Sequence, residues 1–190
     1  MINVGMLTES LSRSGGGIFS SMVGLTKGMR SIGGTDLRIY GFKDDYTEVD
    51  REVWSGINVH AYNPFGARSF KYSPQVKKDL ISSRPDVVHL HGLWTYLSMV
   101  GSHTRKKIGT PLIVSPHGML DDWALRRSAS KKRLASAFFE NENLRNATCL
   151  HALCEEEADS IIRHGIKAPI CVIPNGVDMP KNDFNGWVRP

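Results

Sequence analysis

Residues 111–123, P-L-I-V-S-P-H-G-M-L-D-D-W, decide the fold. Residues 112–114 form a short apolar run without alternation, which is typical of a strand buried on both faces of a parallel sheet. A proline and a glycine then break the strand and leave His117 at its carboxyl end, where open parallel sheets place their ligand crevices. His117 is therefore the leading functional candidate, although an imidazole that only hydrogen-bonds a turn would give the same pattern.

A second strand that ends in a histidine precedes this stretch. Residues 86–94, D-V-V-H-L-H-G-L-W, read as a strand that enters a turn. Alternation sends His89 and His91 to one face, with His91 at the carboxyl end, so His91 is expected to line the same crevice as His117. No carboxylate or cysteine has complementary spacing, and we therefore expect no metal. Trp94 fits either a sugar platform or a packing role.

The amino terminus predicts a strand, a glycine-rich turn and a helix. An apolar strand over residues 2–7 is followed by T-E-S-L-S-R-S-G-G-G, and apolar residues then recur at helical spacing over 18–32. Such a turn aims backbone N–H groups and the positive end of a helix dipole at one point, so it can hold phosphate. The turn matches neither G-x-G-x-x-G nor a Walker loop, which disfavours NAD-dependent enzymes and NTPases; a merely flexible connection also fits.

Strands and helices alternate along the whole chain. Further strands are expected at 37–40, 57–60, 149–152 and 170–173, and helices at 96–108 and 155–163. This order predicts an α/β fold with a doubly wound parallel sheet. The three glutamates at 155–157 fit the dipole of the helix that they open better than they fit catalysis.

Composition places the chain among ordinary globular domains. It has 190 residues, a formal net charge of +5 and three cysteines without metal-ligand spacing. There is no apolar run of about 18 residues and no signal peptide, so a cytoplasmic location is expected. The positive charge points to an anionic partner, but no nucleic-acid-binding motif accompanies it.

A basic segment follows the opening stretch. Its five cations lie beside Trp123 and Leu125 and predict contact with an anionic membrane surface, although a solvated helix face explains them equally well. We expect the next apolar residues, 134 and 137–139, to continue a helix whose apolar side packs on the sheet. The cations are Arg126, Arg127, Lys131, Lys132 and Arg133.

Together, these motifs resemble the amino-terminal domain of a retaining family 4 glycosyltransferase of GT-B architecture. The resemblance covers residues 1–178 and includes E-N-E-N-L-R-N-A-T-C-L-H-A-L-C-E-E-E-A and V-I-P-N-G-V-D. It implies a Rossmann-like half-domain in which Gly16 and Gly17 lie near the donor diphosphate and His117 lies beside the transferred sugar as the catalytic residue. It also implies that His91 and Trp94 border the acceptor side.

The resemblance implies substrates rather than a cofactor. The donor would be a nucleotide sugar such as UDP-glucose or GDP-mannose, used without a metal, and the acceptor a saccharide or a lipid-linked sugar in bacterial exopolysaccharide or lipopolysaccharide assembly. One departure is Cys154, where the family often has a serine that caps the next helix; a thiol caps poorly, so the glutamates must support that helix start.

The resemblance also divides the chain. We expect a domain over residues 1–176 and the beginning of an interdomain linker over 177–190, with the carboxyl-terminal donor-binding domain outside this chain, so that the chain alone is inactive. A non-catalytic half that pairs with a separate catalytic chain is the main alternative. A sugar-nucleotide epimerase, which would release a changed sugar without using an acceptor, is another.

Overall fold

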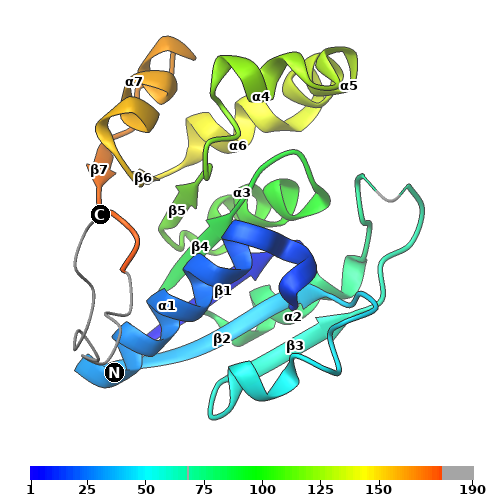
Figure 1. Cartoon of the computed structure of the whole chain (residues 1–190), viewed down its shortest axis with the longest axis vertical. Helices are drawn as coiled ribbons and strands as arrows, with labels where there is room; N and C mark the ends of the chain where they lie inside the picture. Colours follow the sequence, from blue (N-terminus) through cyan, green and yellow to red (C-terminus); the bar gives the residue numbers. More distant parts are fainter. Residues whose placement is uncertain (68, 177–190) are drawn as a thin grey trace, which may run out of the picture.

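The computed structural model describes residues 1–67 and 69–176, so the predicted linker at 177–190 lies outside the described residues. Seven parallel strands form one sheet in the order β3-β2-β1-β4-β5-β6-β7 (Figure 1). This arrangement confirms the doubly wound α/β prediction. The strands are β1 (Ile2–Thr8), β2 (Thr35–Phe42), β3 (Asn58–Tyr62), β4 (Val87–His91), β5 (Leu112–Ser115), β6 (Cys149–Ala152) and β7 (Ile170–Val172).

Helices connect successive strands, as parallel pairing requires. Two short 3₁₀ turns, η1 (Arg13–Gly15) and η2 (Arg51–Trp54), and one π-helical turn, η3 (Ser136–Glu140), accompany them. Within the described residues, no helix combines the length and apolar character needed to cross a bilayer. The α-helices are α1 (Gly16–Ile32), α2 (Pro74–Ser83), α3 (Tyr96–Ile108), α4 (Asp122–Arg126), α5 (Ala129–Ala135), α6 (Asn141–Asn146) and α7 (Glu155–Arg163).

The sheet has an apolar core on each face. Met6 and Leu7 are neighbours on β1 and point to opposite faces, since strand side chains alternate. Met6 packs in the core that contains Met22 of α1. Leu7 packs in the larger core, which includes residues of α2, α3, α6 and α7. The central strands are thus buried on both faces, and β5 accordingly begins with an apolar run, whereas β4 carries two histidines on one face.

The chain reverses its direction of winding between β1 and β4. From β1 the chain moves outward to β2 and β3, then returns through α2 to β4 on the other side of β1. The last residues of these two strands, Thr8 and His91, are paired in register. The turns after β1 and β4 therefore meet at a topological switch point, where open α/β sheets form ligand crevices.

One packing prediction is wrong. Leu134 and Phe138 do not pack on the sheet: their exposed fractions are 61% and 74%. Figure 1 shows α4 and α5 past the end of β5 rather than over the sheet. In addition, the π turn η3 adds one residue to a helical turn and rotates the side chains that follow by about 100°. Glu140 of the same turn points into the protein and has no exposed surface.

Candidate functional site

Two of the predicted site residues are in direct contact. His91 ends β4 and His117 lies in the turn after β5, and His91 Nδ1 is 3.1 Å from His117 Nε2. One nitrogen donates and the other accepts, so the tautomers of the two rings are coupled. The two histidines that the sequence placed at strand ends thus form one unit at the carboxyl edge of the sheet.

Two further histidines extend this unit along the same face of the sheet. His89 Nε2 is 2.7 Å from Ser115 Oγ, which is 2.9 Å from His151 Nδ1. His151 Nε2 lies 2.9 Å from the carbonyl oxygen of Ile173 and must donate to it, since a carbonyl only accepts. The ring centroids of His89 and His91 are 4.0 Å apart. No local sequence pattern singles out His151 or Ser115.

Burial keeps the inner rings uncharged. It lowers the pKa of His117 to about 4 and that of His89 to about 3, and neighbouring histidines add to both shifts. The pKa of His91 lies well below its ordinary value for the same reasons. At neutral pH, these three imidazoles can therefore donate or accept a hydrogen bond without carrying charge.

A cavity of about 270 Å³ lies between these rings and α1. Among the described residues, His91 Nε2 is buried and has no hydrogen-bond partner. A buried polar atom without a partner is costly, so a polar group in this cavity would be stabilised by His91. The lining of the cavity includes Ser21, Gly24, His91, His117, His151 and Asn175.

Glu157 of α7 holds the turn that carries His117. His117 has a φ of 54° and Gly118 a φ of 73°, and a left-handed conformation is uncommon for a histidine. The Gly118 N–H donates to Glu157 Oε1 at 2.7 Å, and the Leu153 N–H donates to Oε2 at 2.7 Å. Glu157 is only 5% exposed. It therefore ties two strand-end turns together, a role that the helix-dipole interpretation of residues 155–157 missed.

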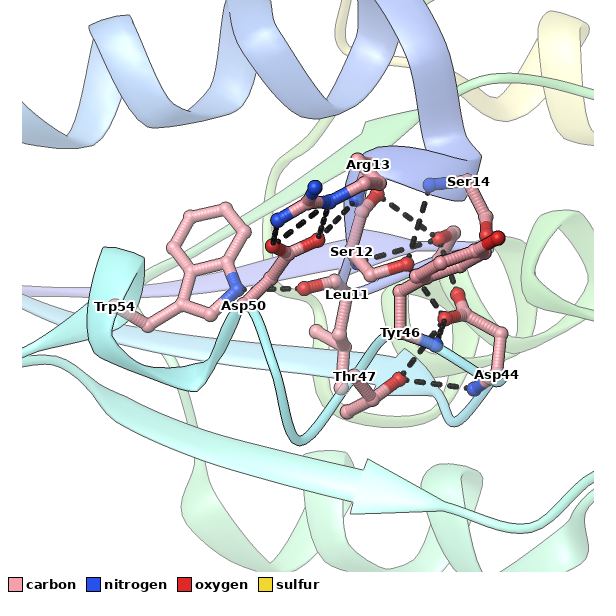
Figure 2. A network of polar contacts seen from close by, with 10 residues as sticks. Leu11, Ser12, Arg13, Ser14, Asp44, Tyr46, Thr47, Asp50 and Trp54 are labelled. Carbon is pink, nitrogen blue, oxygen red and sulfur yellow. Dashed lines mark hydrogen bonds and ion pairs between the residues drawn. The ribbon is translucent and has the colours of Figure 1, made fainter.

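Two aspartates hold the glycine-rich turn after β1 (Figure 2). The hydroxyls of Ser10 and Ser12 donate to Asp44. Asp50 accepts from the Arg13 backbone N–H at 2.8 Å and also pairs with the Arg13 guanidinium. These Arg13 bonds lower the pKa of Asp50 to about 2. The turn is thus fixed by side chains, which argues against a merely flexible connection.

The first turn of α1 is open to a ligand. Gly16 has a φ of 56°, which favours glycine, and no side chain caps the helix. A Cβ atom added at Gly16 or Gly17 would meet no described atom within 4 Å. One added at Gly92 would lie 3.3 Å from Ile18 Cδ1 and 3.4 Å from Met119 Cε, so the turns after β1, β4 and β5 converge. The Gly16 N–H donates to the Arg13 carbonyl oxygen, so a ligand at this turn would meet the N–H groups that follow it.

Trp94 lies apart from the histidine cavity. It has a φ of 69° and lines a separate groove beside Phe70 and Phe138. Its backbone N–H donates to Glu140 Oε2 at 2.7 Å, and the Ser98 hydroxyl donates to the same oxygen at 2.8 Å. Burial raises the pKa of Glu140, although its hydrogen bonds oppose that shift. The structure thus joins His91 with His117 but separates both from the Trp94 side chain.

The fold and this edge define one Rossmann-like half of a GT-B architecture. The chain belongs to the family of glycosyl transferase 4-like domains, whose model matches residues 16–176. No protein of curated function matches it.

Solved structures with the same fold cover most of this chain. They include HepE from Anabaena in complex with UDP-glucose, with 18% identity and a TM-score of 0.67 over 94% of this chain and 45% of HepE. The lipopolysaccharide outer core galactosyltransferase WaaB has 20% identity and a TM-score of 0.60, over 93% of this chain and 46% of WaaB. UDP-GlcNAc 2-epimerase from Neisseria meningitidis, bound to UDP-GlcNAc, has 16% identity and a TM-score of 0.55, over 90% of this chain and 46% of the epimerase. This chain therefore spans less than half of each structure.

The contribution of the Asp50–Arg13 pair to the stability of the protein should depend on pH. The folded-state pKa of Asp50, about 2, lies below its ordinary 3.8, so its contribution is full above about pH 4 and is lost as the pH falls toward 2. Asp50→Asn should therefore lower the free energy of unfolding at pH 7, and the deficit should shrink below pH 4. Urea unfolding at pH 7 and pH 3 measures this. The exposed Asp45→Asn is the control, and an equal deficit at both pH values would contradict the assignment.

Glu157→Gln should disturb the His117 turn. A glutamine offers one acceptor oxygen to the two N–H groups of Gly118 and Leu153, so one buried donor loses its partner, at a cost of about 1–3 kcal/mol. Urea unfolding should show this loss, and NMR should show a shifted His117 imidazole signal. The exposed Glu155→Gln at the same helix end should change neither. An unshifted His117 signal in Glu157→Gln would rule out this positioning role.

Proposed function

We propose that this chain is the acceptor-side half of an enzyme that transfers a hexose from a nucleotide sugar, with retention, to a saccharide or lipid-linked acceptor. UDP-glucose and GDP-mannose are the donors of the expected type. Exopolysaccharide or lipopolysaccharide assembly in a bacterial cytoplasm, at the inner face of the membrane, is the proposed setting. The family supports glycosyl transfer, and the likeness of the fold to HepE, solved with UDP-glucose, supports a nucleotide-sugar donor.

The observation that carries the proposal is a neutral His117 close to an uncapped, glycine-lined helix start at the switch point. In glycosyl transfer the bond between the sugar and the diphosphate breaks, positive charge develops on the sugar ring and negative charge on the leaving group. The N–H groups of the first turn of α1 from Gly17 onward suit the diphosphate, whereas that of Gly16 already donates to Arg13. A neutral imidazole can hydrogen-bond the sugar without repelling its developing positive charge. No metal is required in this scheme.

Epimerisation of a sugar nucleotide is the second candidate, favoured by the likeness of the fold to the Neisseria UDP-GlcNAc 2-epimerase. The two reactions differ in their need for an acceptor. An epimerase changes the sugar without an added saccharide, whereas a transferase releases free nucleoside diphosphate in proportion to the glycoside that it forms. Product analysis with and without an acceptor distinguishes them.

His117 should matter more for turnover than for donor binding. In the full-length protein that contains this chain, His117→Ala should lower kcat by about a hundredfold, typical of a lost transition-state hydrogen bond, while the donor Kd changes little. His117→Asn tolerates the left-handed backbone and separates this effect from turn strain. The exposed His103→Ala is the control. An unchanged kcat in both His117 variants would refute the role.

Gly17→Ala tests the diphosphate site without unfolding the helix. The new methyl group enters open space, and alanine favours a helix interior by roughly 0.5–1 kcal/mol over glycine, so stability should hold or rise. Donor affinity should fall at least about tenfold, because the methyl blocks the approach of the phosphate. Ser31→Ala, at an exposed position near the end of α1 and outside the histidine cavity, should keep full affinity. Isothermal titration calorimetry with UDP measures both, and equal affinities would contradict the placement.

A further inference from the structure

An apolar groove of about 660 Å³ runs between the α5–η3 segment and the turn after β4. Its wall includes side chains that a folded chain normally buries: Phe138 is 74% exposed, Leu134 61% and Met99 41%. Exposed apolar residues that gather in one place, rather than singly, mark a binding surface. We define the apolar groove by Phe70, Trp94, Met99, Leu134, Phe138 and Phe139.

Cations border this groove. Lys131 and Lys132 line it, and Lys132 Nζ lies 5.7 Å from the centroid of the Trp94 ring. In the part of the chain that the structure describes, neither these lysines nor Arg126, Arg127 and Arg133 pair with a carboxylate. Burial and the nearby Arg127 lower the pKa of Lys132. An anion at this border would therefore relieve repulsion as well as gain attraction.

The groove combines apolar walls with a charged border. Its aromatic and aliphatic side chains and its two lysines together suit a molecule with a hydrocarbon chain and an anionic head.

We propose that the apolar groove binds the hydrocarbon chain of a phosphate-bearing lipid acceptor, with Lys131 and Lys132 at its phosphate. This inference rests on the proposed function and narrows its acceptor to a lipid. Trp94 follows His91 by only three residues, so the turn 91–94 joins the groove to the histidine pair. A lipid held in the groove would thus present its head group beside the edge where His117 lies.

The test uses the full-length protein that contains this chain and monomeric dodecyl phosphate, below its micelle concentration, in isothermal titration calorimetry. Dodecyl phosphate should bind at least about tenfold more tightly than dodecanol, and inorganic phosphate should bind more weakly than either. Phe138→Asp should lower the affinity at least about tenfold, because the new carboxylate would lie against the dodecyl chain and repel the phosphate. Lys131→Gln should lower it by about fivefold. Both side chains are exposed, so neither change should unfold the protein.

Matched controls use exposed residues of the same types or of similar character outside the groove. Ile162→Asp, at a side chain that is 59% exposed on α7, and Lys27→Gln on α1 should leave dodecyl phosphate binding unchanged. Absence of dodecyl phosphate binding, or equal affinities for Phe138→Asp and the unmodified protein, would overturn the assignment of the groove as a lipid site. Binding to phosphatidylglycerol vesicles that 0.5 M salt abolishes, without any binding of monomeric dodecyl phosphate, would also overturn it and leave only a surface contact.

UDP titration in the same samples separates the two levels of the proposal. UDP binding without dodecyl phosphate binding would overturn the lipid groove and leave the nucleotide-sugar proposal standing. Dodecyl phosphate binding without UDP binding would count against the transferase and not against the groove.

Discussion

The turns at the carboxyl edge of this sheet depend on carboxylates that accept hydrogen bonds from their backbone N–H groups. Asp50 accepts from Arg13 after β1, Glu140 from Trp94 after β4, and Glu157 from Gly118 and Leu153 after β5 and β6. Turn N–H groups have no strand partner, and a buried one without an acceptor is costly. A charged acceptor forms a stronger bond than a neutral one. The turns can therefore keep unusual backbone conformations, including the left-handed His117 and Trp94.

These anchored turns enclose the histidines at the end of the sheet, where they are buried and uncharged. A parallel sheet between helices normally buries aliphatic side chains, yet His89, His91 and Ser115 occupy the end of one face. The two histidines remain uncharged because burial opposes protonation. His89 Nε2 is hydrogen-bonded to Ser115 and His91 Nδ1 to His117, whereas His91 Nε2 is buried without a partner among the described residues. Polarity is thus concentrated where the strands stop.

Local patterns predicted the elements better than they predicted their partners. The helix at 96–108 and the strand at 149–152 follow from apolar spacing and from glycine or proline stops, which act within a few residues. Glu157 and Glu140 act across 39 and 46 residues, so no local pattern identifies them. Phe138 illustrates a different failure: its spacing fits a helix packed on the sheet, but α5, which leads into η3, lies past the end of β5, so Phe138 is exposed. The pairing of His91 with His117 was predictable because strand order alone brings two neighbouring strand ends together.

The turn η3 serves two surfaces. Glu140 points inward and accepts from the Trp94 N–H, whereas Phe138 stays exposed. The turn 91–94 then sends His91 toward the cavity beside α1 and Trp94 toward the apolar groove. A buried carboxylate and an exposed phenyl ring can share one turn because residues two apart in a helix lie about 200° apart around its axis. Residues 136–140 thus supply both the acceptor that holds the Trp94 turn and a ring that lines the groove, so the two surfaces depend on the same five residues.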